Sequence, residues 1–93
     1  MSIESYLGFA IKSGKIIYGI DSILASKKKK YALVLSKTAT ENLRKKAVLH
    51  SERFNIPLVE VDSLEELIYK QNCKLVAVLD PNLAKAILDC AWR

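Results

Sequence analysis

The most apolar run of the chain is Leu75-Val76-Ala77-Val78-Leu79, and it predicts the central strand of a sheet. A second run, Tyr31-Ala32-Leu33-Val34-Leu35, is also apolar along its whole length. Strands without alternating polar residues are typical of sheets that are covered on both faces. We therefore expect helices on both sides of the sheet.

Helix and strand patterns alternate along the first part of the chain. Apolar residues at helical spacing over residues 3–11 predict an amphipathic helix, and Gly14 is expected to end it. A short strand at residues 16–18 follows. The next helix begins after Gly19 and runs into the four lysines of residues 27–30. Its apolar residues are Ile20, Ile23 and Leu24.

Local capping signals predict the ends of the remaining helices. Thr38-Ala39-Thr40-Glu41 resembles a capping box that opens a third helix, and Asn55, two residues before a proline, is expected to end it. A strand at residues 58–61 precedes a second capping box, Ser63-Leu64-Glu65-Glu66. Asp80-Pro81 supplies an N-cap and a first helical residue for the last helix. The apolar residues expected to face the core from these last two helices are Leu64, Leu67, Ile68, Leu83, Ala84, Ile87, Leu88 and Ala91.

This alternation of helices and strands defines the expected fold class. Five helical and four strand patterns predict an α/β fold, a three-layer α/β/α sandwich with a four-stranded mixed sheet. The length of 93 residues suits a single domain spanning residues 1–93.

The composition favours a folded protein with an anionic partner. Hydrophobic residues make up 51% of the chain, which excludes a basic disordered tail. The net charge of +5 meets one criterion for a nucleic-acid-binding domain. Excess lysine that only increases solubility is the alternative.

Catalytic and metal-binding patterns are not found in the sequence. Cys73 and Cys90 lie far apart without a CxxC motif, so each is expected to behave as a small apolar residue. His50 has no neighbouring nucleophile motif and is expected to be a partly exposed helix residue. The position of Asp80 before Pro81 is explained by helix capping and needs no catalytic role. We expect no enzyme activity, no metal and no cofactor. The sequence has no pattern of a signal peptide or membrane span, which predicts a cytoplasmic protein.

The segment from Gly19 to Lys30 is the clearest candidate for binding a partner. A helix start presents free backbone N–H groups, which suit an anion such as phosphate. Lys27, Lys28, Lys29 and Lys30 add positive charge. We expect Lys15, Gly19, Lys28 and Lys37 to form one phosphate-binding surface. Two alternatives stay open: the lysine run is a solvated helix end, and Lys37, Arg44, Lys45 and Lys46 are an ordinary exposed face.

Five segments of the chain are similar to motifs of one known protein family. Residues 6–16, YLGFAIKSGKI, are similar to L-L-G-L-A-x-R-A-G-K-L, and residues 39–46, ATENLRKK, are similar to A-S-E-N-T-K-K-K. Residues 55–61, NIPLVEV, resemble N-V-P-V-I-E-V. Residues 63–67, SLEEL, and 84–87, AKAI, resemble S-K-E-E-L and A-K-A-I. Together, in this order, the five segments resemble the bacterial YlxQ-type ribosomal proteins of the kink-turn-binding L-seven-Ae / L-thirty-e family.

The resemblance implies a ribosome-associated protein that binds structured, kink-turn-like RNA without catalysis. In the family, the glycine before the second helix and the residues after it meet the bent RNA, and the loop before the fourth strand contacts a flipped-out base. By position, the first site comprises Gly19, Ile20, Asp21, Ser22, Ile23 and Ala25. The second comprises Gln71, Asn72, Cys73 and Lys74.

Three residues depart from the family pattern at the first site. Asp21 replaces Asn or Lys, Ser22 replaces Glu or Gln, and Ala25 replaces Lys. Phosphate contacts position a protein while base contacts specify the sequence, so we expect these changes to reduce specificity before affinity.

Two other functions are compatible with the same fold. A protein-interaction module would use an exposed apolar patch around Tyr18, Ile20 and Ile23. A small-ligand or phosphate-binding module would have a closed pocket at the ends of the strands.

Overall fold

The computed structural model describes residues 2–91 of the chain. Over these residues, five helices and four strands alternate, as the sequence predicts. They are α1 (Ile3–Lys12), β1 (Ile16–Tyr18), α2 (Ile20–Ala25), β2 (Ala32–Ser36), α3 (Glu41–Phe54), β3 (Leu58–Val61), α4 (Leu64–Leu67), β4 (Leu75–Val78) and α5 (Pro81–Ala91).

The four strands form one mixed sheet in the order β1-β4-β2-β3. β4 pairs antiparallel with both β1 and β2, and β2 pairs parallel with β3. The most apolar run therefore forms an interior strand, and every residue of β4 and of β2 is buried. This confirms the expected α/β class and the central position of β4.

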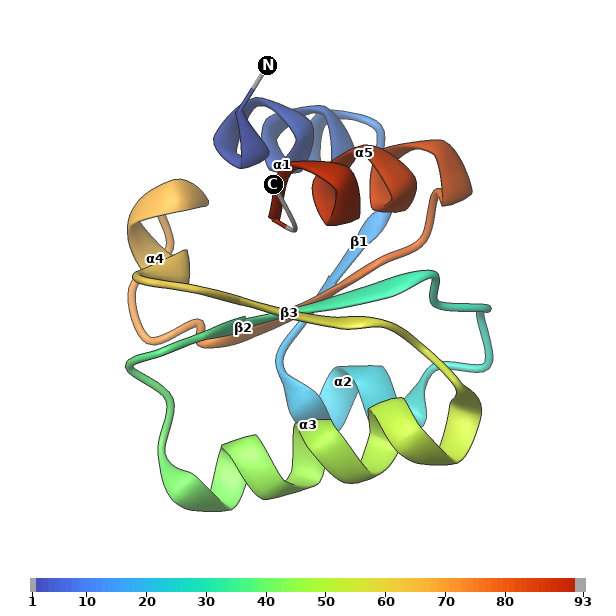
Figure 1. Cartoon of the computed structure of the whole chain (residues 1–93), viewed down its shortest axis with the longest axis vertical. Helices are drawn as coiled ribbons and strands as arrows, with labels where there is room; N and C mark the ends of the chain where they lie inside the picture. The colour runs from blue at the N-terminus through green and yellow to red at the C-terminus, as the bar shows by residue number, and fades with distance from the viewer. Residues whose placement is uncertain (1, 92–93) are drawn as a thin grey trace.

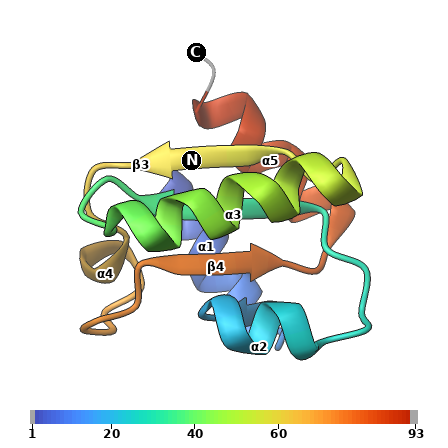
Figure 2. The same cartoon turned by 90° about the horizontal axis from the view of Figure 1, so that it is seen from below.

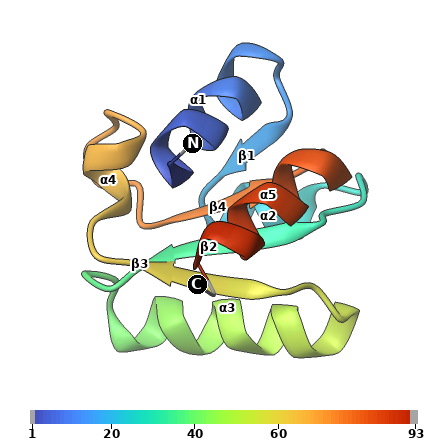
Figure 3. The ribbon, with the colours of Figure 1, turned by 45° about the horizontal axis from the view of Figure 1, so that its top comes forward.

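Helices cover both faces of the sheet, so that the fold has three layers. Figures 1 and 3 show α1, α4 and α5 on one face, and Figure 1 shows α2 and α3 on the other. Alternate residues of one strand enter different cores: Val34 packs with α1 and α5, whereas Leu33 and Leu35 pack with α2 and α3. The unbroken apolar strands follow from this double burial.

Most of the predicted element ends are confirmed. Gly14, with φ of 69°, follows the C-cap of α1, and Asn55 ends α3 in the left-handed conformation with φ of 53°. Asp80 Oδ1 accepts hydrogen bonds from the backbone N–H groups of Asn82 at 2.8 Å and Leu83 at 3.1 Å. Asp80 is therefore the N-cap of α5.

Both predicted capping boxes are wrong in detail. Thr40 caps α3, because its hydroxyl oxygen accepts a hydrogen bond from the N–H of Leu43 at 3.2 Å, and Thr38 instead bonds to Glu65. The side chain of Ser63 makes no capping bond. The hydroxyl of Ser36 accepts from the N–H of Leu64 at 3.2 Å, so the end of β2 caps α4.

Two further expectations are corrected. α2 ends at Ala25, and Lys27–Lys30 form a loop rather than a helix end, so the helix dipole does not explain the lysine run. Leu24 is 56% exposed and only Ile23 of α2 is fully buried. His50 is 7% exposed, because it lies on the face of α3 that packs toward the sheet.

Candidate nucleic-acid interface

The start of α2 and the loop before β4 meet at one end of the sheet. The N–H of Gly19 donates a hydrogen bond to the carbonyl of Leu75 at 2.9 Å, and residues 71–74 directly precede Leu75. The N–H of Ser36 donates to the carbonyl of Lys74 at 2.8 Å, which brings Lys37 to the same end. The two segments that the family resemblance assigns to RNA are thus neighbours.

The side chains of this end differ in their access to a partner. Asp21, Ser22, Ala25, Gln71 and Asn72 are exposed. Gly19, with φ of 83°, and Ile20 are half-buried.

Two of the predicted contact residues are corrected. Ile23 is fully buried and Cys73 is 7% exposed, so neither side chain can reach RNA in this conformation. The thiol of Cys73 donates to the carbonyl of Leu75 at 3.6 Å, and burial raises its pKa. Burial of Ile23 also leaves only the half-buried Tyr18 and Ile20 for the apolar patch on which the protein-interaction alternative depends. Tyr18 is half-buried beneath the ammonium group of Lys70, whose Nζ lies 4.1 Å from the ring centroid.

Carboxylates pair with two of the lysines at this end. Lys37 Nζ lies 3.2 Å from Asp62 Oδ1, and Lys74 pairs with Glu65. The ammonium group of Lys74, together with backbone and hydroxyl hydrogen bonds, lowers the pKa of Glu65 to about 2. Arg44, on the first turns of α3, pairs with Glu60.

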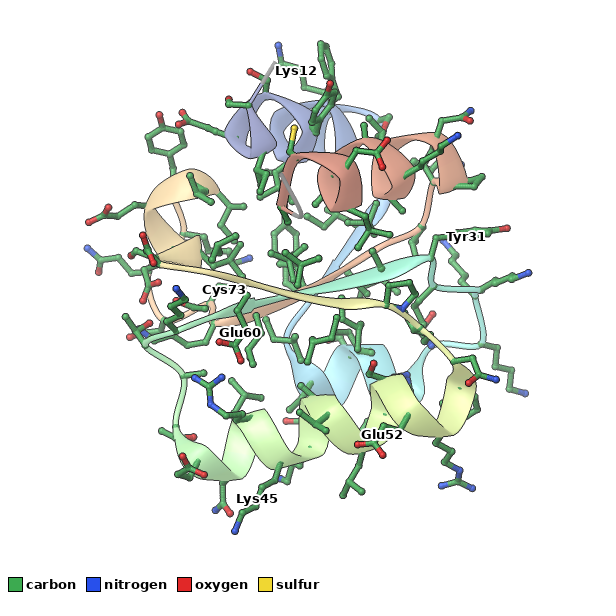
Figure 4. All side chains as sticks on the ribbon, in the orientation of Figure 1. Lys12, Tyr31, Lys45, Glu52, Glu60 and Cys73 are labelled. Atoms are coloured by element: carbon green, nitrogen blue, oxygen red, sulfur yellow. The ribbon has the colours of Figure 1, made fainter. Side chains whose placement is uncertain are left out.

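The remaining predicted lysines lie at the opposite end of the sheet. The carbonyl of Lys15 accepts from the N–H of Leu79, and the N–H of Tyr31 donates to the carbonyl of Val78, both at 2.9 Å. These bonds join the start of β1 and of β2 to the end of β4. Figure 4 shows Tyr31 and Cys73 toward opposite ends of the sheet. The expectation that Lys15, Lys28 and Lys37 surround Gly19 is therefore wrong, because strand direction separates Lys37 from Lys15.

The lysine loop and the C-terminal half of α3 form a pocket of about 930 Å³. Figure 2 shows the segment between α2 and β2 on the same side of the molecule as the last turns of α3. Its cations are Lys27, Lys28, Lys29, Lys30, Lys46 and Arg53. Its apolar and aromatic residues are Leu24, Tyr31, Leu49, Phe54, Ile56 and Pro57.

Charge in this pocket is not neutralised within the described chain. No carboxylate lines the pocket over residues 2–91, and none of its cations belongs to an ion pair there. Lys30 Nζ donates to the carbonyl of Ser26 at 2.7 Å, and Lys29 Nζ lies 5.2 Å from the ring centroid of Tyr31. A cluster of six cations outside any ion pair of the described residues therefore lies at the end opposite Gln71 and Lys74.

His50 lies in the wall of this pocket with an unsatisfied nitrogen. Its Nε2 is buried and has no hydrogen-bond partner among the residues that the structure describes. Burial, followed by the positive charges of Lys30 and Arg53, lowers the pKa of the imidazole. The ring centroid of Phe54 lies 4.7 Å away.

The pocket was not predicted from the sequence, although two of its apolar residues could have indicated it. Leu49 is 67% exposed because it lies off the face of α3 that buries Ala47 and His50. Phe54 is 56% exposed at the end of the same helix. Large apolar residues outside the buried stripe, beside a lysine run, indicate a surface with a binding role.

Comparison with known proteins supports the fold and gives no functional assignment. The structure is similar to a protein with unknown function from Bacillus halodurans, with a TM-score of 0.89 and 19% sequence identity. The alignment covers 98% of this chain and 97% of that one. No family model matches the sequence, and no curated protein matches it.

Residues 2–91 contain neither a helix that could span a membrane nor a metal-binding cluster. Over residues 2–91, no helix has the length and apolarity required to cross a bilayer. The same residues contain no group of three or more His, Cys, Asp or Glu side chains that could hold a metal ion.

Proposed function

We propose that this chain is a non-enzymatic, cytoplasmic, ribosome-associated protein of the L-seven-Ae / L-thirty-e type that binds structured RNA. The observation that carries the proposal is the hydrogen bond from Gly19, at the start of α2, to Leu75, which directly follows the Gln71–Lys74 loop at the same end of the sheet. These two segments are far apart in the sequence, and the resemblance implies that both contact a kink-turn. Their proximity allows one bent RNA to reach both.

The lysine loop supports the same proposal through its position beyond α2. The six residues of α2 span about 9 Å, so the loop lies within a few phosphate spacings of Gly19. Lys27, Lys28 and Lys29 are exposed and belong to no ion pair over residues 2–91. RNA that docks at Gly19 can therefore extend its backbone along α2 to these cations.

The residues at the helix start limit the expected specificity. Asp21 and Ser22 are exposed at the positions where the family carries Asn or Lys and Glu or Gln. The negative charge of Asp21 opposes phosphate approach. We therefore expect the lysines to provide most of the affinity and expect a modest preference for kinked RNA.

The test is a titration of kink-turn RNA and of an unbent duplex across a range of salt concentrations. Binding to both is expected at low salt, with tighter binding to the kink-turn and a log–log slope of about −0.9 per phosphate contact on the duplex. Replacing Lys27, Lys28 and Lys29 together by Gln should reduce the magnitude of the slope by up to about three contacts.

The matched control replaces Lys85, an exposed lysine of α5 on the other face of the sheet, by Gln. This variant should leave the slope unchanged. Equal affinity for kink-turn and duplex would remove the kink-turn preference from the proposal. No binding to either RNA at low salt would remove RNA binding altogether.

A further inference from the structure

We propose that the pocket between the Lys27–Lys30 loop and the C-terminal half of α3 binds a nucleoside phosphate. The pocket lies at the end of the sheet opposite Gln71–Lys74. The inference therefore does not depend on the RNA-binding function proposed above. It follows from three independent properties of the pocket: its charge, its apolar walls and an unsatisfied buried nitrogen.

The charge of the pocket favours an anionic ligand. Six cations line it, no carboxylate of residues 2–91 does, and the ion pairs of the described chain all lie elsewhere. Uncompensated positive charge around a concavity raises the local concentration of anions. Lysine and arginine are the side chains that bind phosphate most strongly.

The walls of the pocket require an apolar, flat portion in the same ligand. Leu24, Leu49 and Phe54 are each more than half exposed in the pocket. Tyr31 adds a second aromatic ring. An aromatic side chain next to cations is the arrangement on which a base stacks while its phosphate is neutralised. Inorganic phosphate or a sugar polyphosphate would leave these side chains unused.

His50 supplies a directional contact for the edge of the base. Its Nε2 lacks a hydrogen-bond partner, and the lowered pKa of the imidazole keeps the ring neutral near pH 7. A neutral imidazole donates or accepts one hydrogen bond at this atom, depending on its tautomer. The positive charges of Lys30 and Arg53 act on the ring, and Arg53 and Phe54 are exposed side chains. Both line the pocket beside His50, so the inference requires that they move aside when a base approaches Nε2.

The volume of the pocket and its buried nitrogen favour a small ligand over an extended surface. A volume of about 930 Å³ lies within the range of small-molecule sites and exceeds the need of one nucleotide. A buried unpaired nitrogen has no role in binding to the plane of a membrane, whereas it costs stability if nothing satisfies it. These features select a nucleoside phosphate over an anionic lipid surface.

The direct test is a titration of ¹⁵N-labelled protein with AMP, GMP, CMP and UMP, followed by NMR. At least one nucleotide should bind at submillimolar to millimolar concentration and shift the imidazole nitrogens of His50 together with the amides of α3. The chain has a single histidine, so its side-chain signals are unambiguous. The corresponding nucleoside and inorganic phosphate alone should each bind more weakly.

Two exposed residues provide variants that should remain folded. Phe54→Ala removes the stacking ring and should weaken nucleotide binding about 10-fold. Lys46→Gln removes one phosphate partner and should weaken it about 5-fold. The control Lys85→Gln, on α5, should change the affinity less than about 2-fold. Circular dichroism of each variant checks that the fold is retained.

Four results would overturn the inference. They are no binding of any mononucleotide at millimolar concentration, inorganic phosphate binding as tightly as the nucleotides, an equal loss in Lys85→Gln, and binding to phosphatidylserine vesicles without binding to nucleotides. Failure of kink-turn RNA to bind would leave a positive mononucleotide result intact, so this proposal and the RNA proposal fail separately.

Two kinds of molecule present a nucleoside phosphate to the pocket: a free nucleotide and an unpaired nucleotide within an RNA. A short single-stranded RNA with a 5′-phosphate distinguishes them. Much tighter binding of the oligonucleotide, with the same shifts at His50, supports an RNA source. Equal affinity for oligonucleotide and mononucleotide supports a free nucleotide.

Discussion

The only histidine of the chain makes the stability of the protein depend on pH near neutrality. Burial, with Lys30 and Arg53 nearby, lowers the pKa of His50 from its usual value of 6.5. The unfolded chain therefore takes up a proton at a higher pH than the folded chain does. We expect the free energy of unfolding to fall as pH decreases below about 6.5 and to level off below the folded pKa.

Urea denaturation at a series of pH values between 7.5 and 5.5 (roughly one unit on either side of the usual histidine pKa) measures this dependence. His50→Leu should abolish the slope in this range, since no other histidine titrates there. An unchanged slope in the variant would mean that the imidazole is equally easy to protonate in both states. Nucleotide binding through Nε2 would stabilise the folded protein further.

At the scale of elements, Glu65 connects three segments that are distant in the sequence. On α4, it accepts hydrogen bonds from Ser36 Oγ at 2.9 Å and Thr38 Oγ1 at 3.0 Å, and it pairs with Lys74 before β4. Its pKa, lowered from 4.5 to about 2, means that the folded protein favours the carboxylate. This contribution is complete above pH 4.5 and is lost as pH falls toward 2.

Glu65→Gln should therefore destabilise the protein near pH 7 and have a smaller effect as pH falls from about 4.5 to 2. Chemical denaturation over this range provides the measurement. The control is Glu66→Gln, its exposed neighbour on α4. A destabilisation by Glu65→Gln that is the same at every pH would show that the carboxylate charge is not the stabilising feature.

The helices and strands could be predicted where residues that are close in the sequence determine the structure. Asn55 and Asp80 act within four residues of their own positions, and the apolar runs of β2 and β4 identify buried strands by composition. Thr38 and Thr40 are equally suitable caps by type, and the choice between them depends on Glu65, 27 residues beyond Thr38. Such a choice cannot be read from a window of sequence.

The charge of the candidate site could be predicted from the sequence, but its geometry could not. The lysines of residues 27–30 are visible in the sequence, whereas the pairing of Lys37 and Lys74 with carboxylates depends on strand order. Burial of His50 and Ile23 depends on which side of each helix faces the sheet. The pocket lies between a loop and the end of a helix, so it cannot be identified from the sequence of either segment alone.

At the scale of the whole molecule, the distribution of charge opposes folding at one end. Lys37, Arg44 and Lys74 are paired, while the cations around the pocket repel one another without carboxylates in the described chain. Lys28→Glu introduces an opposite charge into this cluster. We expect it to raise the free energy of unfolding by up to about 1 kcal/mol at low salt, and by much less at high salt where the charges are screened.

Urea denaturation at low and at high salt measures this effect, and Lys85→Glu on α5 is the control because Lys85 lies outside the cluster. The same Lys28→Glu change should weaken the binding of nucleotides and RNA, since it removes the charge that an anion would neutralise. A stabilised protein with reduced binding would mean that the lysine loop is kept for a ligand at a cost in stability. A variant that is equally destabilised at both salt concentrations would instead mean that Lys28 supports the fold.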